Sequence, residues 1–404
     1  MDDLELGRRL LGVERALGDL RRGVPVVLTG RQDFVSLPVE TLTPARFGVL
    51  AQAASASPLL LLAASTHWAL RPLPAAGEEE PAPLRAFALT EEVSPDFLRA
   101  LACPSFAAEP RERPPLRPHP LPAEAPGLIG LAKLARLAPL VLAAPLGTGG
   151  ERWAEERGWL KVLIEDVLAF PALEAASLER VAEAEVPLAI APATRLVAFR
   201  PAWGGIEHLA IVIGAPEKRD APLVRLHSAC LTGDLLGSLR CDCGPQLQAA
   251  LAAIAAEGDG VVLYLAQEGR GIGLVNKLRA YALQDSGLDT LEANLALGFG
   301  ADERRFLLAA ALLRALGLPR IRLLTNNPEK VAALEAYGIE ITARLPLVIP
   351  PNGINDFYLA TKARRFGHHL PAAPNAADGG EVEEKPRSPS AEAASPLVPR
   401  HGRG

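Results

Sequence analysis

The sequence predicts an α/β fold, with a mixed sheet flanked by helices in its C-terminal part and a separate α/β domain before it. The first observation is that short apolar runs alternate with longer amphipathic runs between residues 194 and 370, which is the pattern of sheets covered by helices. The second is that glycine and proline stand at the junctions of these runs, where turns are expected. The third is composition: 49% of the 404 residues are hydrophobic and 22% are charged, which suits two or three domains with buried cores.

Each element follows from a local pattern. The run GVVLYLA is almost continuously apolar, as expected of a strand that is covered on both faces. The run PQLQAALAAIAAE places Leu247, Leu251 and Ile254 on one helical face, begins with proline and is followed by glycine, the preferred asymmetry of helix ends. On the same grounds we predict strands at residues 209–214, 223–226, 260–266, 320–324 and 339–345, and helices at residues 245–257, 272–284, 304–316 and 328–337.

Charge and hydropathy exclude several classes of protein. The formal net charge of −5 gives no general attraction to nucleic acid. No apolar run reaches the ~18–20 residues that span a bilayer, and the amphipathic, acidic N-terminus is unlike a secretion or organelle signal. We therefore expect a cytoplasmic protein without nucleic-acid or membrane partners. Residues 371–404 are rich in Pro, Ala, Gly, Ser and charge and are predicted to form a disordered tail.

Three of the four cysteines lie close together in the segment HSACLTGDLLGSLRCDCG. Cys230, Cys241 and Cys243 fall within fourteen residues, whereas Cys103 lies far upstream. Such a cluster suits one zinc ion, and three protein ligands leave the fourth position open for water, as in catalytic sites. A closed structural site completed by His227 remains an alternative. A disulfide framework is not expected from this spacing.

Three further segments stand where the chain leads into predicted helices: QEGRGIG (267–273), GADERRF (300–306) and TNNPEK (325–330). Glycine lets the backbone approach a ligand, and the free N–H groups of a helix N-terminus favour phosphate. Each segment alone also has an ordinary explanation as a connecting turn or a capped helix, with Asp302 as a cap and Lys330 exposed. They gain weight because they occur together with the cysteines.

Together with RLHSACLTGDLLGSLRCDCGPQLQAAL (225–251) and DTLEAN (289–294), these segments resemble GTP cyclohydrolase II over about residues 194–370. The resemblance implies a zinc enzyme that hydrolyses GTP at C8 of guanine, opens the imidazole ring and releases formate and pyrophosphate. The implied product is 2,5-diamino-6-(5-phosphoribosylamino)pyrimidin-4(3H)-one, formed in the first step of riboflavin biosynthesis. A homodimer is also implied, with Mg²⁺ bound to the GTP triphosphate.

The resemblance assigns roles to individual residues. Cys230, Cys241 and Cys243 would hold the zinc ion. Asp302 would be the general base and Tyr281 would lie near the ring being opened, although a core position on its helix would explain Tyr281 equally well. Arg304 would attack or clamp the α-phosphate, and clamping is the safer role because arginine stays protonated. The implied substrate contacts are Arg225, His227, Ser228, Gln246, Glu268, Gly269, Arg270, Thr290, Thr325 and Lys330.

The sequence departs from the family pattern at three positions. Ala229 stands where glutamate is common, and Leu265 and Ala266 stand where many members have a polar or basic pair. We expect activity to survive, with substrate affinity the open question. Two alternatives remain: a non-catalytic nucleotide-binding or regulatory homologue with structural zinc, and a related cyclohydrolase that stops early or uses another purine nucleotide.

Residues 1–193 loosely resemble a 3,4-dihydroxy-2-butanone 4-phosphate synthase domain at GRRLLGVERALGDLRRGVPVVLTG. The acidic run of that family is replaced by GRQDFVSLPVETL, in which Asp33 and Glu40 are the only acids, so the clustered carboxylates that would bind Mg²⁺ are lost. We therefore predict a degenerate, non-catalytic domain here, with residues 72–125 divergent or loop-like, followed by a catalytic domain over residues 194–370.

Overall fold

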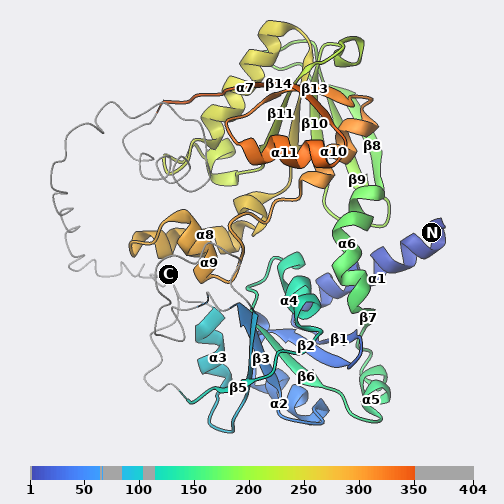
Figure 1. Ribbon diagram of the computed structural model, residues 1–404, viewed down its shortest axis with the longest axis vertical. Coiled ribbons are helices and arrows are strands. Elements are labelled where there is room, and N and C mark those ends of the chain that lie inside the picture. Colours follow the sequence, from blue (N-terminus) through green and yellow to red (C-terminus); the bar gives the residue numbers. More distant parts are fainter. Residues whose placement is uncertain (1, 64–65, 67–83, 103–113, 351–404) are drawn as a thin grey trace, which may run out of the picture. The chain divides into compact units, whose positions relative to one another are not determined.

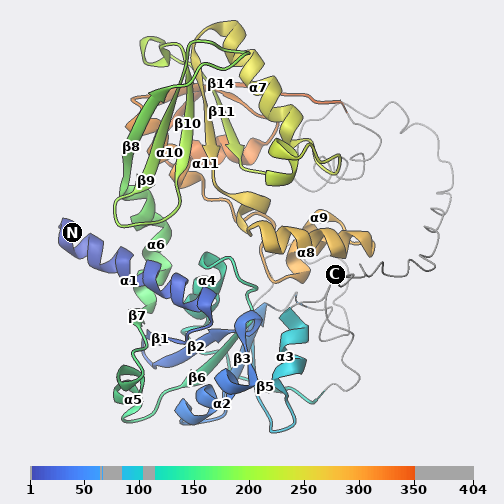
Figure 2. The same cartoon turned by 180° about the vertical axis from the view of Figure 1, so that it is seen from behind.

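The computed structural model describes residues 2–63, 66, 84–102 and 114–350. The predicted tail at residues 371–404 lies outside the described residues. The described residues belong to one compact unit of the chain, and they form two sheets of seven strands each (Figures 1 and 2). No helix in the described ranges is long and apolar enough to cross a membrane.

The first sheet is built from the N-terminal part of the chain, in the order β5-β4-β3-β6-β2-β1-β7. Neighbouring strands are antiparallel except for the parallel pair β1 and β7. Its strands are β1 Val26–Thr29, β2 Phe34–Pro38, β3 Leu59–Ala63, β4 Leu84–Ala88, β5 Arg117–His119, β6 Val141–Pro145 and β7 Lys161–Leu163. Its helices are α1 Asp3–Arg22, α2 Pro44–Ala53, α3 Pro95–Ala102, α4 Ala125–Leu134, α5 Gly150–Glu156 and α6 Ile164–Ala176, with a short turn η1 Val39–Thr41.

Both faces of this sheet are covered because its strand residues alternate between two apolar clusters. Val26 and Leu28 of β1 belong to the cluster with α1, α4 and α6, whereas Val27 belongs to the cluster with α2 and α3. Successive side chains of a strand point to opposite faces. The N-terminal part is therefore a helix–sheet–helix sandwich, in agreement with the mixed α/β class that the sequence predicts.

The prediction that residues 72–125 are loop-like is wrong for the described residues. They include β4, which pairs with β3, as well as α3 and β5. Pro95 begins α3 rather than breaking it, since proline is tolerated in the first helical turn, and Phe97, Leu98 and Leu101 of that helix are buried. The abundance of proline hid these elements in the sequence.

The second sheet has the order β14-β13-β11-β12-β10-β9-β8. The four strands from β14 to β12 are parallel, and β10, β9 and β8 continue antiparallel. Its strands are β8 Leu178–Glu185, β9 Thr194–Pro201, β10 His208–Ile213, β11 Leu223–Ser228, β12 Gly260–Leu265, β13 Arg320–Leu324 and β14 Glu340–Leu345. Its helices are α7 Cys243–Glu257, α8 Leu274–Asp285, α9 Thr290–Ala296, α10 Phe306–Ala315 and α11 Pro328–Ala336, with short turns η3 Pro216–Lys218, η4 Leu231–Leu235 and η5 Glu268–Gly271.

Helices cover both faces of the second sheet. Val261 and Leu263 of β12 pack in a cluster with α10 and α11, and Val262 packs in another with α7. Figure 1 shows α10 and α11 in front of the sheet, and Figure 2 shows α7 in front of it when seen from behind. This mixed sheet with flanking helices confirms the predicted fold class.

The predicted strands and helices of this part are all present, with small differences at their ends. The sequence interpretation missed α9, although DTLE is a capping box in which Asp289 and Glu292 bond each other's backbone. It also missed β8 and β9, so the predicted boundary between residues 193 and 194 falls inside the sheet, between these two strands. The domain limits themselves stay a prediction.

Candidate active site

Three parallel strands of the second sheet end at one pocket. The segment after β11 carries Cys230, the segment after β12 carries Glu268, and the segment after β13 begins with Thr325. Ligands of open α/β sheets bind at such carboxyl ends. The pocket occupies about 1050 Å³, counting its open mouth. Its lining includes these predicted residues: Arg225, His227, Ser228, Cys230, Cys241, Cys243, Gln246, Glu268, Gly269, Arg270, Tyr281, Thr290, Arg304, Thr325 and Lys330.

The three cysteines meet at this pocket with a spacing that fits a metal ion. Their sulfur atoms all lie within 4.8 Å of one another, and the Sγ atoms of Cys230 and Cys241 are 3.7 Å apart. A tetrahedral zinc ion with Zn–S bonds of about 2.3 Å holds its sulfur ligands about 3.8 Å apart. The donor set and the spacing therefore both suit zinc.

Gly233 makes this close approach possible. It lies in η4, and a Cβ placed on it would come within 2.9 Å of Cys241 Sγ and 3.1 Å of Cys230 Sγ. Its backbone N–H also donates to Cys230 Sγ at 3.3 Å. The sulfur cluster thus closes around a backbone that has no room for a side chain.

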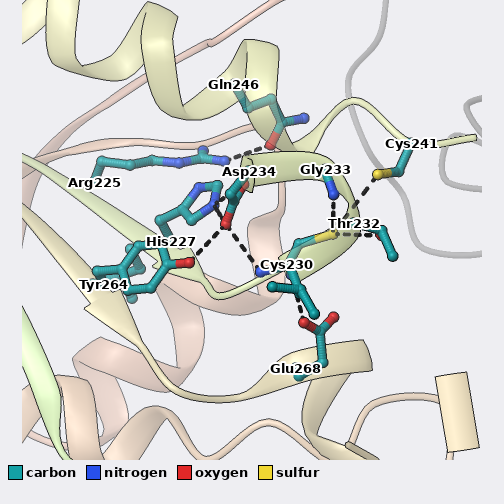
Figure 3. A network of polar contacts seen from close by, with 12 residues as sticks. Arg225, His227, Cys230, Thr232, Gly233, Asp234, Cys241, Gln246, Tyr264 and Glu268 are labelled. Atoms are coloured by element: carbon teal, nitrogen blue, oxygen red, sulfur yellow. Dashed lines mark hydrogen bonds and ion pairs between the residues drawn. The ribbon is translucent and has the colours of Figure 1, made fainter. Parts of the chain in front are cut away.

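His227 faces a carboxylate beside the sulfur cluster. Its Nε2 lies 3.0 Å from both carboxylate oxygens of Asp234. Oδ2 of Asp234 also accepts from the Cys230 backbone N–H at 2.9 Å and from the Tyr264 hydroxyl at 3.0 Å. Figure 3 shows these side chains converging on Asp234. Among the described residues, the candidate metal-ligand group contains the three cysteines without His227, so the geometry disfavours the closed site with histidine as the fourth ligand.

The protonation of the cysteines is uneven. Hydrogen bonds from Cys241 and then from Cys243 hold the pKa of the Cys230 thiol far below its ordinary value. The hydrogen bond to Cys230 conversely raises the pKa of Cys241. The two pKa shifts run in opposite directions, so Cys230 is the sulfur of this pair that holds a negative charge more readily. That charge is paired, because Lys277 Nζ donates to Cys230 Sγ at 2.9 Å.

Asp302 and Arg304 bind each other. Oδ1 of Asp302 accepts from the backbone N–H and Nε of Arg304 at 3.0 and 2.8 Å, and Oδ2 accepts from Nε at 2.9 Å and from Nη2. Burial acts to raise the pKa of Asp302, but Arg304 outweighs it and the pKa lies below its ordinary value. The helix α10 begins only at Phe306, so Asp302 does not cap it. Arg304 lines the pocket, whereas Asp302 is not among the lining residues.

Two buried cations line the pocket. Arg225 donates from Nη1 to the Leu324 carbonyl at 2.9 Å and from Nη2 to Gln246 Oε1 at 2.6 Å, and burial lowers its pKa to about 10. Lys330 donates to the Leu226 carbonyl at 2.9 Å and is only 6% exposed. The alternative of a solvent-exposed Lys330 is therefore wrong. The pocket therefore contains buried positive charge although the chain as a whole is acidic.

The helices α8 and α9 place two further predicted residues at the pocket. Tyr281 lies on α8, and Thr290 is the first residue of α9. Both line the pocket, and the guanidinium carbon of Arg240 lies 4.8 Å from the centroid of the Tyr281 ring. Tyr281 thus faces the pocket, which favours the site interpretation over a purely structural position.

The loop that carries Asp302 and Arg304 is held from two sides. Oε1 of Glu303 accepts from Lys133 of α4 at 2.6 Å and from the Gly300 backbone at 2.7 Å, and Arg305 pairs with Glu174 of α6. A Cβ on Gly271 would come within 2.6 Å of the Glu303 carbonyl oxygen. Residues outside the predicted motifs therefore position this loop, and sequence reasoning gave no signal for them.

Comparisons with known proteins agree with this arrangement. The family model for GTP cyclohydrolase II matches residues 179–346. The chain is 45% identical over 370 residues to GTP cyclohydrolase-2 of Azospirillum brasilense, covering 88% of this chain and 93% of that protein. It is 42% identical over 292 residues to riboflavin biosynthesis protein RibBA of Phocaeicola vulgatus, covering 68% of this chain and 72% of that protein. Among solved structures, RibBX, a two-domain 3,4-dihydroxy-2-butanone 4-phosphate synthase from A. baumannii, is 18% identical with a TM-score of 0.30, covering 83% of this chain and 99% of that chain.

These alignments correct the prediction of a degenerate N-terminal region. An alignment that covers 88% of the chain extends well beyond residues 194–370. The described residues of the N-terminal part also form a seven-stranded sheet with two apolar clusters. The prediction gave too much weight to the missing acidic run, whereas fold and similarity depend on the many residues of the core. The chain is a fusion of two intact folded parts.

Proposed function

Because the chain belongs to the GTP cyclohydrolase II family, we propose that its pocket catalyses zinc-dependent hydrolysis of GTP, opening the guanine imidazole ring and releasing formate and pyrophosphate. The product would be 2,5-diamino-6-(5-phosphoribosylamino)pyrimidin-4(3H)-one. The chain is thus an enzyme of riboflavin biosynthesis. The observation that carries the proposal is the cysteine cluster, in which the Cys230 and Cys241 sulfurs lie 3.7 Å apart, a spacing that suits zinc. The cluster lines the same pocket as Arg304.

The cysteines would supply three ligands and leave a fourth position for water. The chemistry that a zinc ion held there would supply is the activation of water and the polarisation of the atom under attack. Cys230, Cys241 and Cys243 would hold the ion, and the Asp234 carboxylate would fix the loop of Cys230 through its backbone N–H. Tyr281, on the pocket wall, would lie against the purine ring. His227 would keep its orientation through Asp234.

The cations of the pocket would bind the triphosphate. Arg225, Arg270 and Lys330 line the pocket, and arginine and lysine are the usual partners of phosphate oxygens. Gln246 is oriented by Arg225. Ser228, Gly269, Thr290 and Thr325 lie on the same lining and complete the proposed contacts. We expect Mg²⁺ to accompany the triphosphate and the chain to act as a homodimer.

Substrate would switch Asp302 into a base. While Arg304 donates hydrogen bonds to both carboxylate oxygens of Asp302, these oxygens are occupied and the pKa of Asp302 stays low. A phosphate that draws Arg304 away would remove these hydrogen bonds, and the pKa of Asp302 would rise toward its ordinary value. A carboxylate freed in this way accepts a proton more readily. Arg304 would thus couple phosphate binding to the activation of Asp302.

The test is turnover of GTP by the full chain loaded with zinc and Mg²⁺. We expect release of formate and pyrophosphate, and loss of formate release in Cys241→Ser while the fold persists by circular dichroism. Pyrophosphate without formate would contradict ring opening and indicate a reaction that stops early. Neither product from folded, zinc-loaded protein would instead favour a binding or regulatory role, for which Ala229 would then be the first position to examine.

A further inference from the structure

Lys277 is buried at the cysteine cluster and has no role in the proposal above. It lies on α8 and is only 8% exposed. Its Nζ donates to Cys230 Sγ at 2.9 Å, to Thr232 Oγ1 at 2.8 Å and to Glu268 Oε1 at 2.8 Å. A lysine ammonium has three donors, so all of them are used. The ammonium is therefore fixed beside one particular sulfur of the three.

Glu268 is bound to the same assembly. Its Oε1 accepts from Lys277 and from the Gly269 backbone at 3.1 Å, and its Oε2 accepts from the Leu231 backbone at 2.6 Å. Leu231 directly follows Cys230, and Figure 3 shows Glu268 reaching toward this loop. Both carboxylate oxygens are thus occupied by protein donors. This arrangement suits a residue that holds the loop better than one that contacts GTP.

The backbone directly after Glu268 has an unusual conformation. Gly269 and Arg270 have φ values of 63° and 59°, in the left-handed region that a non-glycine residue such as Arg270 seldom adopts. These two left-handed residues lie in the short segment between Glu268 and α8, the helix that carries Lys277. Such strain persists only where the surrounding structure enforces it.

We propose that Lys277 and Glu268 form a positioning pair for the metal site, in which Lys277 fixes and neutralises the Cys230 thiolate and Glu268 fixes Lys277. The inference rests on the zinc site of the proposed function. Three thiolates and one Zn²⁺ carry a net charge of −1, which the ammonium offsets. A hydrogen bond to one thiolate also reduces its electron donation, so a bound metal keeps more of its Lewis acidity.

The experiment compares metal binding in three variants of the full chain. Lys277→Met keeps the length of the side chain but removes its charge and donors, Lys277→Arg keeps both, and Lys218→Met makes the first change at an exposed lysine. Zinc affinity is measured by competition with a chromophoric chelator. The second readout is the sulfur-to-metal charge-transfer absorption of Co²⁺-substituted protein, which a merely structural role would not move.

We expect Lys277→Met to weaken zinc binding by about 10- to 100-fold, as the loss of other partners of metal ligands does. The cobalt charge-transfer band should move to longer wavelength, because an unbonded thiolate gives up its electrons more easily. Lys277→Arg should lie between this variant and the parent chain, and Lys218→Met should match the parent. Parental zinc affinity and an unmoved band in folded Lys277→Met would overturn the inference.

A second variant covers the case in which Lys277→Met does not fold. Glu268→Gln preserves size but removes the carboxylate that holds the ammonium, so we expect a smaller change of both readouts in the same direction. No change in either readout would overturn the inference. Neither measurement uses GTP, so a chain that binds zinc as expected but releases no formate would refute the proposed function and leave this inference standing.

Discussion

Replacing Gly233 with alanine tests whether the cysteine cluster is built for a metal. The new Cβ would lie 2.9 Å from Cys241 Sγ, 2.9 Å from Cys243 Cβ and 3.1 Å from Cys230 Sγ, where ordinary contact begins at 3.4 Å. The deficits are 3.4 − 2.9 = 0.5 Å and 3.4 − 3.1 = 0.3 Å. At least two of the three cysteines must therefore move away from the spacing that zinc requires.

The cost follows from packing energetics. Overpacking a close-packed site costs about 1–3 kcal/mol, which corresponds to a loss of about 5- to 150-fold in zinc affinity if the metal-bound form carries the strain. We expect this loss in a competition titration against a chromophoric chelator. Gly12→Ala is the matched control, because among the described residues no atom lies within 4 Å of its added Cβ. Zinc affinity equal to that of the parent chain in Gly233→Ala would refute the account of the site.

Three further predictions concern other parts of the structure. Burial lowers the pKa of His208 to about 4 in the folded chain, whereas the same histidine has a pKa of about 6.5 in the unfolded chain. As the pH falls, His208 is therefore protonated first in the unfolded chain. Its titration should leave the free energy of unfolding unchanged above pH ~6.5 and lower it by up to about 3 kcal/mol toward pH ~4. Urea titrations should show this fall, and His208→Gln should flatten it. Asp302→Asn should lower formate release from GTP by at least about 100-fold, the usual contribution of a general base, with zinc affinity unchanged; formate release at the parental rate would exclude the base role. Lys133→Ala removes the 2.6 Å contact between Lys133 Nζ and Glu303 Oε1. Because this ion pair is partly exposed, the loss should lower kcat/KM for GTP by no more than about fivefold. Steady-state kinetics would show whether the loop of Asp302 and Arg304 depends on this contact.

Sequence patterns were sufficient for the elements around the pocket other than α9, because the causes of those elements are local. The helix α7 follows from the apolar spacing of Leu247, Leu251 and Ile254 and from the glycine at residue 258, which ends it with a φ of 87°. The same holds for the strands that end at the pocket, whose apolar runs are complete in the sequence. The cysteine cluster was recognisable because its three cysteines are close along the chain.

Other features depend on contacts between distant residues, which periodicity cannot reveal. Lys277 and Cys230 are 47 residues apart in sequence, but Lys277 Nζ lies 2.9 Å from Cys230 Sγ. From the sequence alone, the lysine is indistinguishable from any other polar residue on an amphipathic helix. The pairing of Asp302 with Arg304 was hidden for another reason. Both residues were recognised from the sequence, but only the geometry shows that the guanidinium of Arg304 donates hydrogen bonds to both carboxylate oxygens of Asp302.

The central claim is that this pocket opens the imidazole ring of GTP, and following one carbon atom tests it most directly. The full chain, loaded with zinc and Mg²⁺, is incubated with GTP labelled with ¹³C at C8, and the products are observed by NMR, with Cys241→Ser as control. The account predicts that the label appears in formate with the parent chain and stays in the nucleotide with Cys241→Ser. A label that stays in an intact guanine ring when zinc-loaded parent chain is present would contradict the account.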